Sequence, residues 1–434
     1  MALASTQILE HGNWLTAPRN VKRCPVSTTA TKRSNIRSMG VSSERHVDRL
    51  FDEASVTSST SRFFCWFVLI IASASITSCA GGPGSAMLHP VAATAKAGSP
   101  VNVLVATTRK RSETDKRDFT NERNYGLAYE SYTISVPARH VANEIEWPSK
   151  VPGNPATDFV ALKSAPLDEA NFNRNVIQDA NGTGEVTVFV HGYKTSYERA
   201  VFRAAQLKHD SRFPEAIVAF AWPSRDAVGD YLTDRESATF SRDYLEQLLG
   251  SLARTPGIRR INIIAHSMGN LLAMETLRQA AIRGKSAFLP KLGEVFLMSP
   301  DIDLDVFATQ LTVIGKRNPP ITVAISADDE ALAVSQWLSG DLPRVGNVLI
   351  EDTKETHDTI AQYGLRVINM SDAESMDALN HSKFIELLPS LKQMSRNEAR
   401  VRRNPLSRTG LFVFNTAGAL LDTPRQLGSA ITQQ

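Results

Sequence analysis

The segment INIIAHSMGN, residues 261–270, places a serine where an apolar run ends and a run with helical apolar spacing begins. A nucleophilic serine is lifted above a sheet on a sharp strand-to-helix bend, and small residues two positions before and after it let the bend close. Ala265 and Gly269 hold these positions around Ser267. Glycine is more usual at the first, and alanine is still small. We therefore predict that Ser267 is a nucleophile, and the alternative is a serine that only caps a helix.

A second turn, in VFVHGYKTS (residues 188–196), also follows an apolar run. An oxyanion hole needs backbone N–H groups aimed at the negative charge that develops on the substrate oxygen. We expect the amides of Tyr193 and Met268, the residue after the nucleophile, to form it. His191 and His266 lie before or beside Ser267, whereas the base of such a site usually comes last in the chain. They are interpreted as turn-shaping or packed residues.

Two places along the chain could supply the carboxylate that orients a catalytic base. ISADDEAL contains Asp328 and Asp329 after the penultimate predicted strand, which is the usual place, and MSPDIDLD contains Asp301 and Asp303. Asp329 is the preferred candidate, and helix capping is the alternative role for the others.

Only two histidines follow these acids, His357 and His381. His357 lies in a polar stretch before the last predicted strand, and His381 lies on the loop after it. Since that loop reaches the carboxyl edge of the sheet, His381 is the predicted base.

The elements that must position these residues are short apolar runs alternating with longer amphipathic ones. The β-branched, nearly continuous runs are typical of strands buried on both faces of a parallel sheet. Strands alternating with helices predict a doubly wound α/β domain, in which ligands bind outside the carboxyl ends of the strands. YESYTISVPAR, residues 129–139, alternates instead and predicts an antiparallel extension. The predicted strands are 101–107, 185–192, 216–224, 261–267, 294–301, 321–329 and 365–370.

These features together resemble the α/β-hydrolase superfamily, and within it a bacterial esterase/lipase-like family of largely unassigned function. The resemblance covers about residues 100–390. It implies hydrolysis of an ester-type bond through Ser267, Asp329 and His381, with no metal and no cofactor, and it places the acid directly before an "xAL" helix start. The segments that carry it, in chain order, are VATTRK, EIEWP, VFVHGYKTSYERAVFR, FAWPS, IIAHSMGN, MSPDIDLDVF, DDEALAVSQWL and LNHSKF.

The front of the chain contains FFCWFVLIIASASIT, residues 63–77, which is too short for a spanning helix of about 20 residues and suits a signal peptide. The following ITSC resembles the lipobox of bacterial lipoproteins, which implies a lipid on Cys79. About 60 residues precede the apolar run, so either the true start lies downstream, where Met39 is available, or the run is an uncleaved membrane anchor; a buried helix is the remaining alternative. A lipid on Cys79 and an uncleaved anchor both predict a membrane-anchored protein of the bacterial cell envelope, facing the periplasm or the exterior.

Composition sets the remaining limits. The chain has 434 residues, 42% of them hydrophobic, and a net charge of +3, which is too small to indicate a nucleic-acid partner. All three cysteines lie at or before residue 79, so the body has no disulfide framework and no thiolate metal site.

The predicted organisation is an N-terminal extension without structure (1–62), a signal or anchor (63–79), a flexible linker (80–99), a hydrolase domain (100–395) and a basic tail (396–434).

The expected function is therefore a membrane-associated serine hydrolase that cleaves a small acyl ester through an acyl-enzyme. Acyl transfer by the same three residues, and a non-catalytic envelope-binding lipoprotein with a hydrolase fold, are the alternatives. The segments 222–240 and 334–356 are expected to overhang the site. Tyr193, Trp222 and Trp337 are expected either to line its pocket or to belong to the core.

Overall fold

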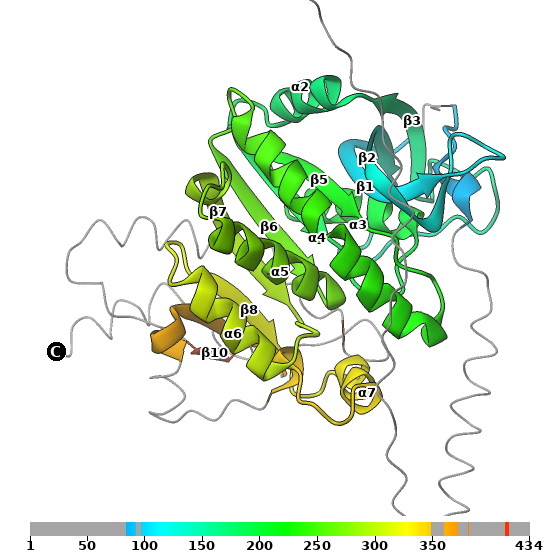
Figure 1. Ribbon diagram of the computed structural model, residues 1–434. Helices are drawn as coiled ribbons and strands as arrows, with labels where there is room; N and C mark the ends of the chain where they lie inside the picture. The colour runs from blue at the N-terminus through cyan, green and yellow to red at the C-terminus, as the bar shows by residue number, and fades with distance from the viewer. Residues whose placement is uncertain (1–83, 93–96, 349–359, 372–380, 382–412, 416–434) are drawn as a thin grey trace, which may run out of the picture. The chain divides into compact units, whose positions relative to one another are not determined.

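The computed structural model describes residues 84–92, 97–348, 360–371, 381 and 413–415, all within one compact unit of the chain, residues 76–434 (Figure 1). The predicted extension (1–62), the apolar run with Cys79, and His357 lie outside the described residues, as does most of the predicted tail.

A single twisted sheet forms the centre of the described unit. Its strands lie in the order β10-β9-β8-β7-β6-β4-β5-β1-β2-β3. The run from β10 to β1 is parallel, and β2 and β3 extend it as antiparallel strands. The prediction of a doubly wound, mostly parallel α/β fold is confirmed. The strands are β1 (Ser99–Arg111), β2 (Phe119–Val136), β3 (Val160–Leu167), β4 (Glu185–Val190), β5 (Ala216–Ala221), β6 (Arg260–His266), β7 (Leu292–Met298), β8 (Ile321–Ile325), β9 (Leu365–Asn369) and β10 (Val413–Asn415).

Helices cover both faces of this sheet. Apolar residues of α2, α4, α5 and α6 belong to one hydrophobic cluster, and those of α3 belong to another on the opposite face. Figure 1 shows α4, α5 and α6 in front of the strands. The helices are α2 (Glu169–Asp179), α3 (Tyr197–Asp210), α4 (Tyr231–Arg254), α5 (Met268–Arg283), α6 (Leu304–Ile314) and α7 (Glu330–Leu338).

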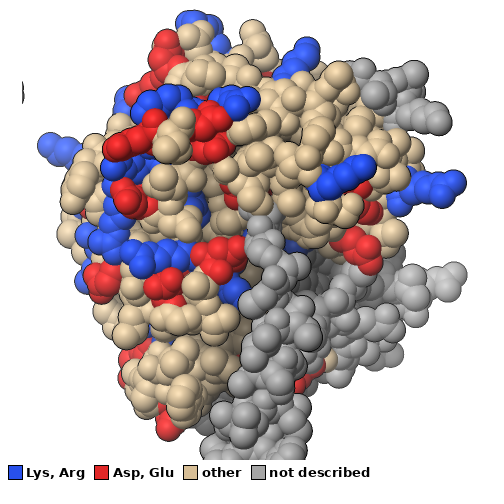
Figure 2. Space-filling model, turned by 90° about the vertical axis from the view of Figure 1, so that its right-hand side faces the viewer, with Lys and Arg blue, Asp and Glu red and all other residues tan. Residues whose placement is uncertain are grey.

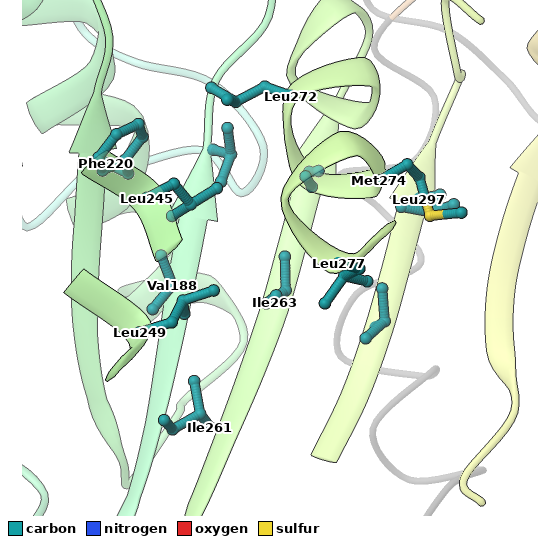
Figure 3. Packing of buried hydrophobic residues seen from close by; sticks show 14 of the residues in the cluster. Val188, Phe220, Leu245, Leu249, Ile261, Ile263, Leu272, Met274, Leu277 and Leu297 are labelled. Carbon is teal, nitrogen blue, oxygen red and sulfur yellow. The ribbon is translucent and has the colours of Figure 1, made fainter. Parts of the chain in front are cut away.

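The central strands are apolar on both faces because both faces are covered. All six residues of β5 and all five of β8 are buried. Figure 3 shows Leu245 and Leu249 of α4 and Leu277 of α5 packed over Val188 and Ile263 of the sheet. Burying such side chains contributes roughly 1.5–3 kcal/mol each, so this packing stabilises the sheet that carries the site.

Two polar residues of the predicted site region also begin helices. The Asp303 carboxylate accepts the amides of Asp305 and Val306 at the start of α6, and Asp329 accepts the amide of Leu332 at the start of α7. Such N-caps satisfy amides that have no partner within the helix.

Three segments differ from the sequence-based expectation. Residues 84–92, predicted as part of a flexible linker, contain a 3-10 helix (Ser85–Leu88) and pack on the body, because Leu88 is buried and the Val91 amide donates to Ala161. β10 lies within the predicted tail and pairs with β9. Much of the predicted overhang 222–240 is the start of α4, whose inner face is buried.

Charged side chains of both signs are mixed over the face seen in Figure 2. Many charged side chains of the described residues pair, as Lys110 does with Glu113 and Glu122. Among the described residues, none of the helices has the length and apolar content needed to cross a bilayer.

Candidate active site

Ser267 occupies the sharp bend between β6 and α5. Its backbone angles are φ 52° and ψ −124°, a conformation that costs a non-glycine residue of order 1–3 kcal/mol. Hydrogen bonds hold the bend in place. The Ser267 amide donates to Met298 O at 3.0 Å, and its carbonyl accepts from Asn270 Nδ2 at 2.9 Å and from the Asp301 amide at 3.3 Å. This is the geometry expected of a nucleophile elbow.

Two glycines let the bend and the turn after β4 come together. A Cβ at Gly269 would lie 2.4 Å from the carbonyl oxygen of His191, and a Cβ at Gly192 would lie 2.9 Å from Cβ of Ser267. Neither position has room for a side chain. Ala265, by contrast, is fully buried within β6, where its methyl group is accommodated.

His381 and Asp329 meet although 52 residues separate them. Nδ1 of His381 lies 2.7 Å from Oδ2 and 3.0 Å from Oδ1 of a fully buried Asp329 side chain. A carboxylate accepts a proton donated from Nδ1, which leaves Nε2 of a neutral imidazole as the acceptor. The rings of His381 and His266 have centroids 4.6 Å apart, and His266 directly precedes Ser267. The structure therefore brings Ser267, His381 and Asp329 to one edge of the sheet.

The other three candidate carboxylates have different partners. Asp301 accepts from the hydroxyls of Tyr231 (2.9 Å) and Ser335 (2.5 Å), and Nε of Arg344 lies 3.3 Å from it. Asp328 accepts from the Ser326 hydroxyl, and Asp303 caps α6.

Of the two histidines interpreted as structural, His191 is buried and His266 is half-buried. Burial lowers the pKa of His191 to about 3, and its ring stacks on Trp222 with centroids 4.9 Å apart. Burial, together with the neighbouring His381, also holds the pKa of His266 well below its usual value. Both side chains are therefore uncharged at neutral pH, and they pack at the base of the site.

The predicted oxyanion donors flank Ser267. Met268 is the first residue of α5, and Tyr193 follows Gly192, which packs on the serine. Within the described part of the chain, neither amide has a hydrogen-bond acceptor. The Tyr193 side chain donates to carbonyls of Ala227 and Val228, and burial raises its pKa to about 12.

The two tryptophans weighed as pocket residues differ. Trp222 is fully buried, and its Nε1 donates to His191 O at 2.8 Å, so it belongs to the core. Trp337 of α7 is 68% exposed.

Three buried polar residues beneath the site had not been expected from the sequence. Arg109 of β1 donates from Nη2 to the carbonyls of Thr195 (2.7 Å) and Ser224 (2.9 Å). Asp234 of α4 accepts from the Ser224 hydroxyl at 2.5 Å. Arg109 and Ser224 lie in VATTRK and FAWPS. The available signal was a charged residue directly after an apolar run, since the predicted strand ended at residue 107 and only the structure extends β1 to Arg111.

Two groups of described residues have donor atoms close enough to hold a metal ion. One is His140, His209 and Asp210, and the other is His89 with Asp115 and Asp118. In the first, both ring nitrogens of His140 already contact carboxylates, of Glu146 and Asp210, at 2.8 Å. Neither group contains a predicted site residue.

Comparisons with solved structures find similar chains at low identity. The esterase Pf2001 of Pyrococcus furiosus is 12% identical, with 73% of this chain and 98% of that chain covered and a TM-score of 0.30. An esterase of Pyrobaculum calidifontis is 11% identical, with 63% and 82% covered and a TM-score of 0.31. An acetyl xylan esterase is 10% identical, with 49% and 97% covered and a TM-score of 0.29.

No curated protein matches the chain. A family model described as "Alpha/beta hydrolase of unknown function (DUF900)" matches residues 166–398, which include Ser267, Asp329 and His381. The chain therefore belongs to this α/β-hydrolase family of unknown function.

Proposed function

We propose that this α/β hydrolase is a serine hydrolase that cleaves a carboxylic ester through a covalent acyl-enzyme. The observation that carries the proposal is the contact of His381 Nδ1 with the buried Asp329 carboxylate at 2.7 Å, on the edge of the sheet where Ser267 is held in a strained elbow. Strained backbone of this kind clusters at active sites.

In the first half of the reaction, Nε2 of His381 accepts the proton of the Ser267 hydroxyl as Oγ attacks the ester carbonyl. The carbonyl oxygen becomes an oxyanion, which the amides of Tyr193 and Met268 stabilise. The tetrahedral intermediate then collapses, the ester C–O bond breaks, and His381 gives its proton to the departing alcohol. Asp329 stabilises the imidazolium while it exists.

In the second half, water takes the place of the alcohol. His381 removes a proton from the water, hydroxide adds to the acyl carbon, and the same two amides hold the second oxyanion. Collapse breaks the bond to Ser267 Oγ, which recovers its proton from His381, and the carboxylic acid leaves. The positive end of α5, which begins at Met268, favours the negative charge in both halves.

The first experiment labels the purified full-length protein with a fluorescent fluorophosphonate, beside Ser267→Ala and His381→Ala. His357→Ala is the matched control, because it removes the other late histidine. We expect labelling of the wild type and the control and loss in the two site variants. A folded wild type that does not label would contradict the proposal.

Membrane attachment is the second part of the proposal, and it rests on the apolar run 63–77 and the lipobox-like ITSC. We propose that Cys79 carries a lipid and holds the protein at the bacterial cell envelope. Metabolic labelling with an alkyne fatty acid, compared between wild type and Cys79→Ser, tests this. Equal labelling of both chains would contradict it.

A further inference from the structure

The turn that contains the candidate oxyanion donor Tyr193, residues 192–196, is held from below by buried charged residues. The contacts begin directly after Tyr193. The Lys194 amide donates to Oδ2 of Asp234 at 3.4 Å, and the Thr195 amide donates to Oγ of Ser224 at 3.1 Å. The Thr195 carbonyl accepts from Nη2 of Arg109 at 2.7 Å. Three backbone groups of two consecutive residues are thus bonded to these side chains.

The turn needs this support because its backbone is strained. Lys194 has a φ of 54°, in the left-handed region that a residue with a Cβ rarely adopts. On the other side of Tyr193, Gly192 is pressed against Ser267. Gly192 and Lys194, the residues on either side of Tyr193, are therefore both held in place. Together they set the direction in which the Tyr193 N–H points.

The supporting side chains form one connected group. Arg109 bridges the turn after β4 to the turn after β5, because the same Nη2 also donates to Ser224 O at 2.9 Å. Ser224 donates in turn to Asp234, which also accepts the Arg225 amide at 2.8 Å. Burial lowers the pKa of Arg109 to about 10, and Glu198 and Asp234 partly offset this, so Arg109 remains a cation at neutral pH. Burying a charge is costly, and a site that retains one requires a reason.

We infer that Arg109 and Asp234 are positioning residues, which act through Ser224 and the turn 192–196 to aim the Tyr193 amide at the oxyanion. This rests on the proposed function. Neither side chain touches the reacting atoms. Nη1 of Arg109 donates to Asn121 Oδ1 while Nη2 holds the Thr195 and Ser224 carbonyls. Lysine cannot replace Arg109 in this role, since its single ammonium lacks the planar fork that makes both sets of contacts.

The test compares full-length wild type with Arg109→Met and Ser224→Ala, using p-nitrophenyl acetate as the probe ester. Fluorophosphonate titration counts active sites, so that kcat is expressed for each reactive serine. Arg283→Met is the matched control, because Arg283 is exposed on α5 and pairs only with Asp243 and Glu246 among the described residues.

We expect kcat for each labelled site to fall about 100-fold in Arg109→Met, with KM little changed, as when an oxyanion donor is lost. Ser224→Ala should lose about tenfold, because only one hydroxyl is removed. The inhibition constant of an aryl trifluoromethyl ketone, whose serine adduct carries an oxyanion, should rise by the same factors. Arg283→Met should match the wild type.

Fewer labelled sites with an unchanged kcat for each site would mean that Arg109 only supports folding, and would overturn the inference. If Arg109→Met does not fold, Ser224→Ala provides the test. A kcat and an inhibition constant equal to those of the wild type in Ser224→Ala would also overturn the inference. A wild type that neither labels nor hydrolyses the probe would instead refute the proposed function, and this inference with it.

Discussion

The α-carbon of Gly269 lies so close to the carbonyl of His191 that a Cβ there would be 2.4 Å from the oxygen. This contact joins the helix that follows Ser267 to the turn that follows β4. It therefore fixes the distance between the two candidate oxyanion amides, Met268 and Tyr193, through backbone atoms alone. Side-chain rearrangement cannot relieve an added methyl group at this position.

Gly269→Ala is accordingly expected to lose both stability and reactivity. The new methyl group would meet the carbonyl oxygens of His191 and Val190, and overpacking of this kind costs on the order of 1–3 kcal/mol. Urea unfolding and fluorophosphonate labelling measure the two losses. Gly229→Ala, at a position with open space around it, should resemble the wild type. Labelling of Gly269→Ala at the wild-type level would show that the close approach of Gly269 to His191 is not needed for the reactivity of Ser267.

Replacement of the strained serine should stabilise the fold while it abolishes reactivity. Because Ser267 has a φ of 52°, Ser267→Gly is expected to raise the free energy of unfolding by about 1 kcal/mol. Ser267→Ala keeps the Cβ and should gain less. Thermal unfolding of the two variants side by side measures the difference, and equal stability of the two would argue against strain at the elbow.

The Asp329 carboxylate should matter through its charge and its contact with His381. Asp329→Asn keeps the shape but presents an amide to Nδ1, which favours the wrong tautomer of His381 and should lower kcat about 10⁴-fold. Asp328→Asn is the matched control, because Asp328 accepts from Ser326. Steady-state hydrolysis of p-nitrophenyl acetate measures both variants. A comparable loss of kcat in Asp328→Asn and Asp329→Asn would contradict the assignment of Asp329, rather than Asp328, as the partner of His381.

His140, a histidine outside the candidate site, should make the free energy of unfolding depend on pH. Burial opposes its charge, but the carboxylates of Asp210 and Glu146 outweigh burial and raise its pKa above 6.5. The stabilisation is therefore full below pH 6.5 and is lost as the pH rises through the raised pKa. Burial also opposes the charge of Asp210, yet its hydrogen bonds, beginning with that from His140, lower its pKa to about 2. The stabilisation that the Asp210 carboxylate contributes is therefore present above pH 3.8 and is lost as the pH falls toward 2.

The measurement is urea unfolding of wild type and His140→Gln at pH 5.5 and at pH 9. The variant should be less stable than the wild type by on the order of 1 kcal/mol at pH 5.5, and by less at pH 9. His209→Gln, at a more exposed neighbour of Asp210, should show a smaller difference at pH 5.5. A loss in His140→Gln that is the same at both pH values would contradict the ion pair.

Local patterns in the sequence were enough to predict the parallel strands from β1 to β9 and the elbow, but not the edge strands β3 and β10. The apolar run before Ser267, the small residues around it and the helical spacing after it are all neighbours along the chain, and strand and helix periods depend on such neighbours. The packing of residues 84–92 could not be predicted in the same way, since Leu88 is buried by segments far away in the sequence.

By itself, the sequence determined the fold class, the position of Ser267 and a short set of acids and histidines that could serve it. Only the tertiary structure decided that Asp329, rather than Asp301, Asp303 or Asp328, lies against His381. It also showed that Arg109 of β1 reaches Thr195 across 86 residues. The physical reason is that local periodicity depends on adjacent residues, whereas these contacts depend on which strands lie side by side in the sheet and where their ends meet.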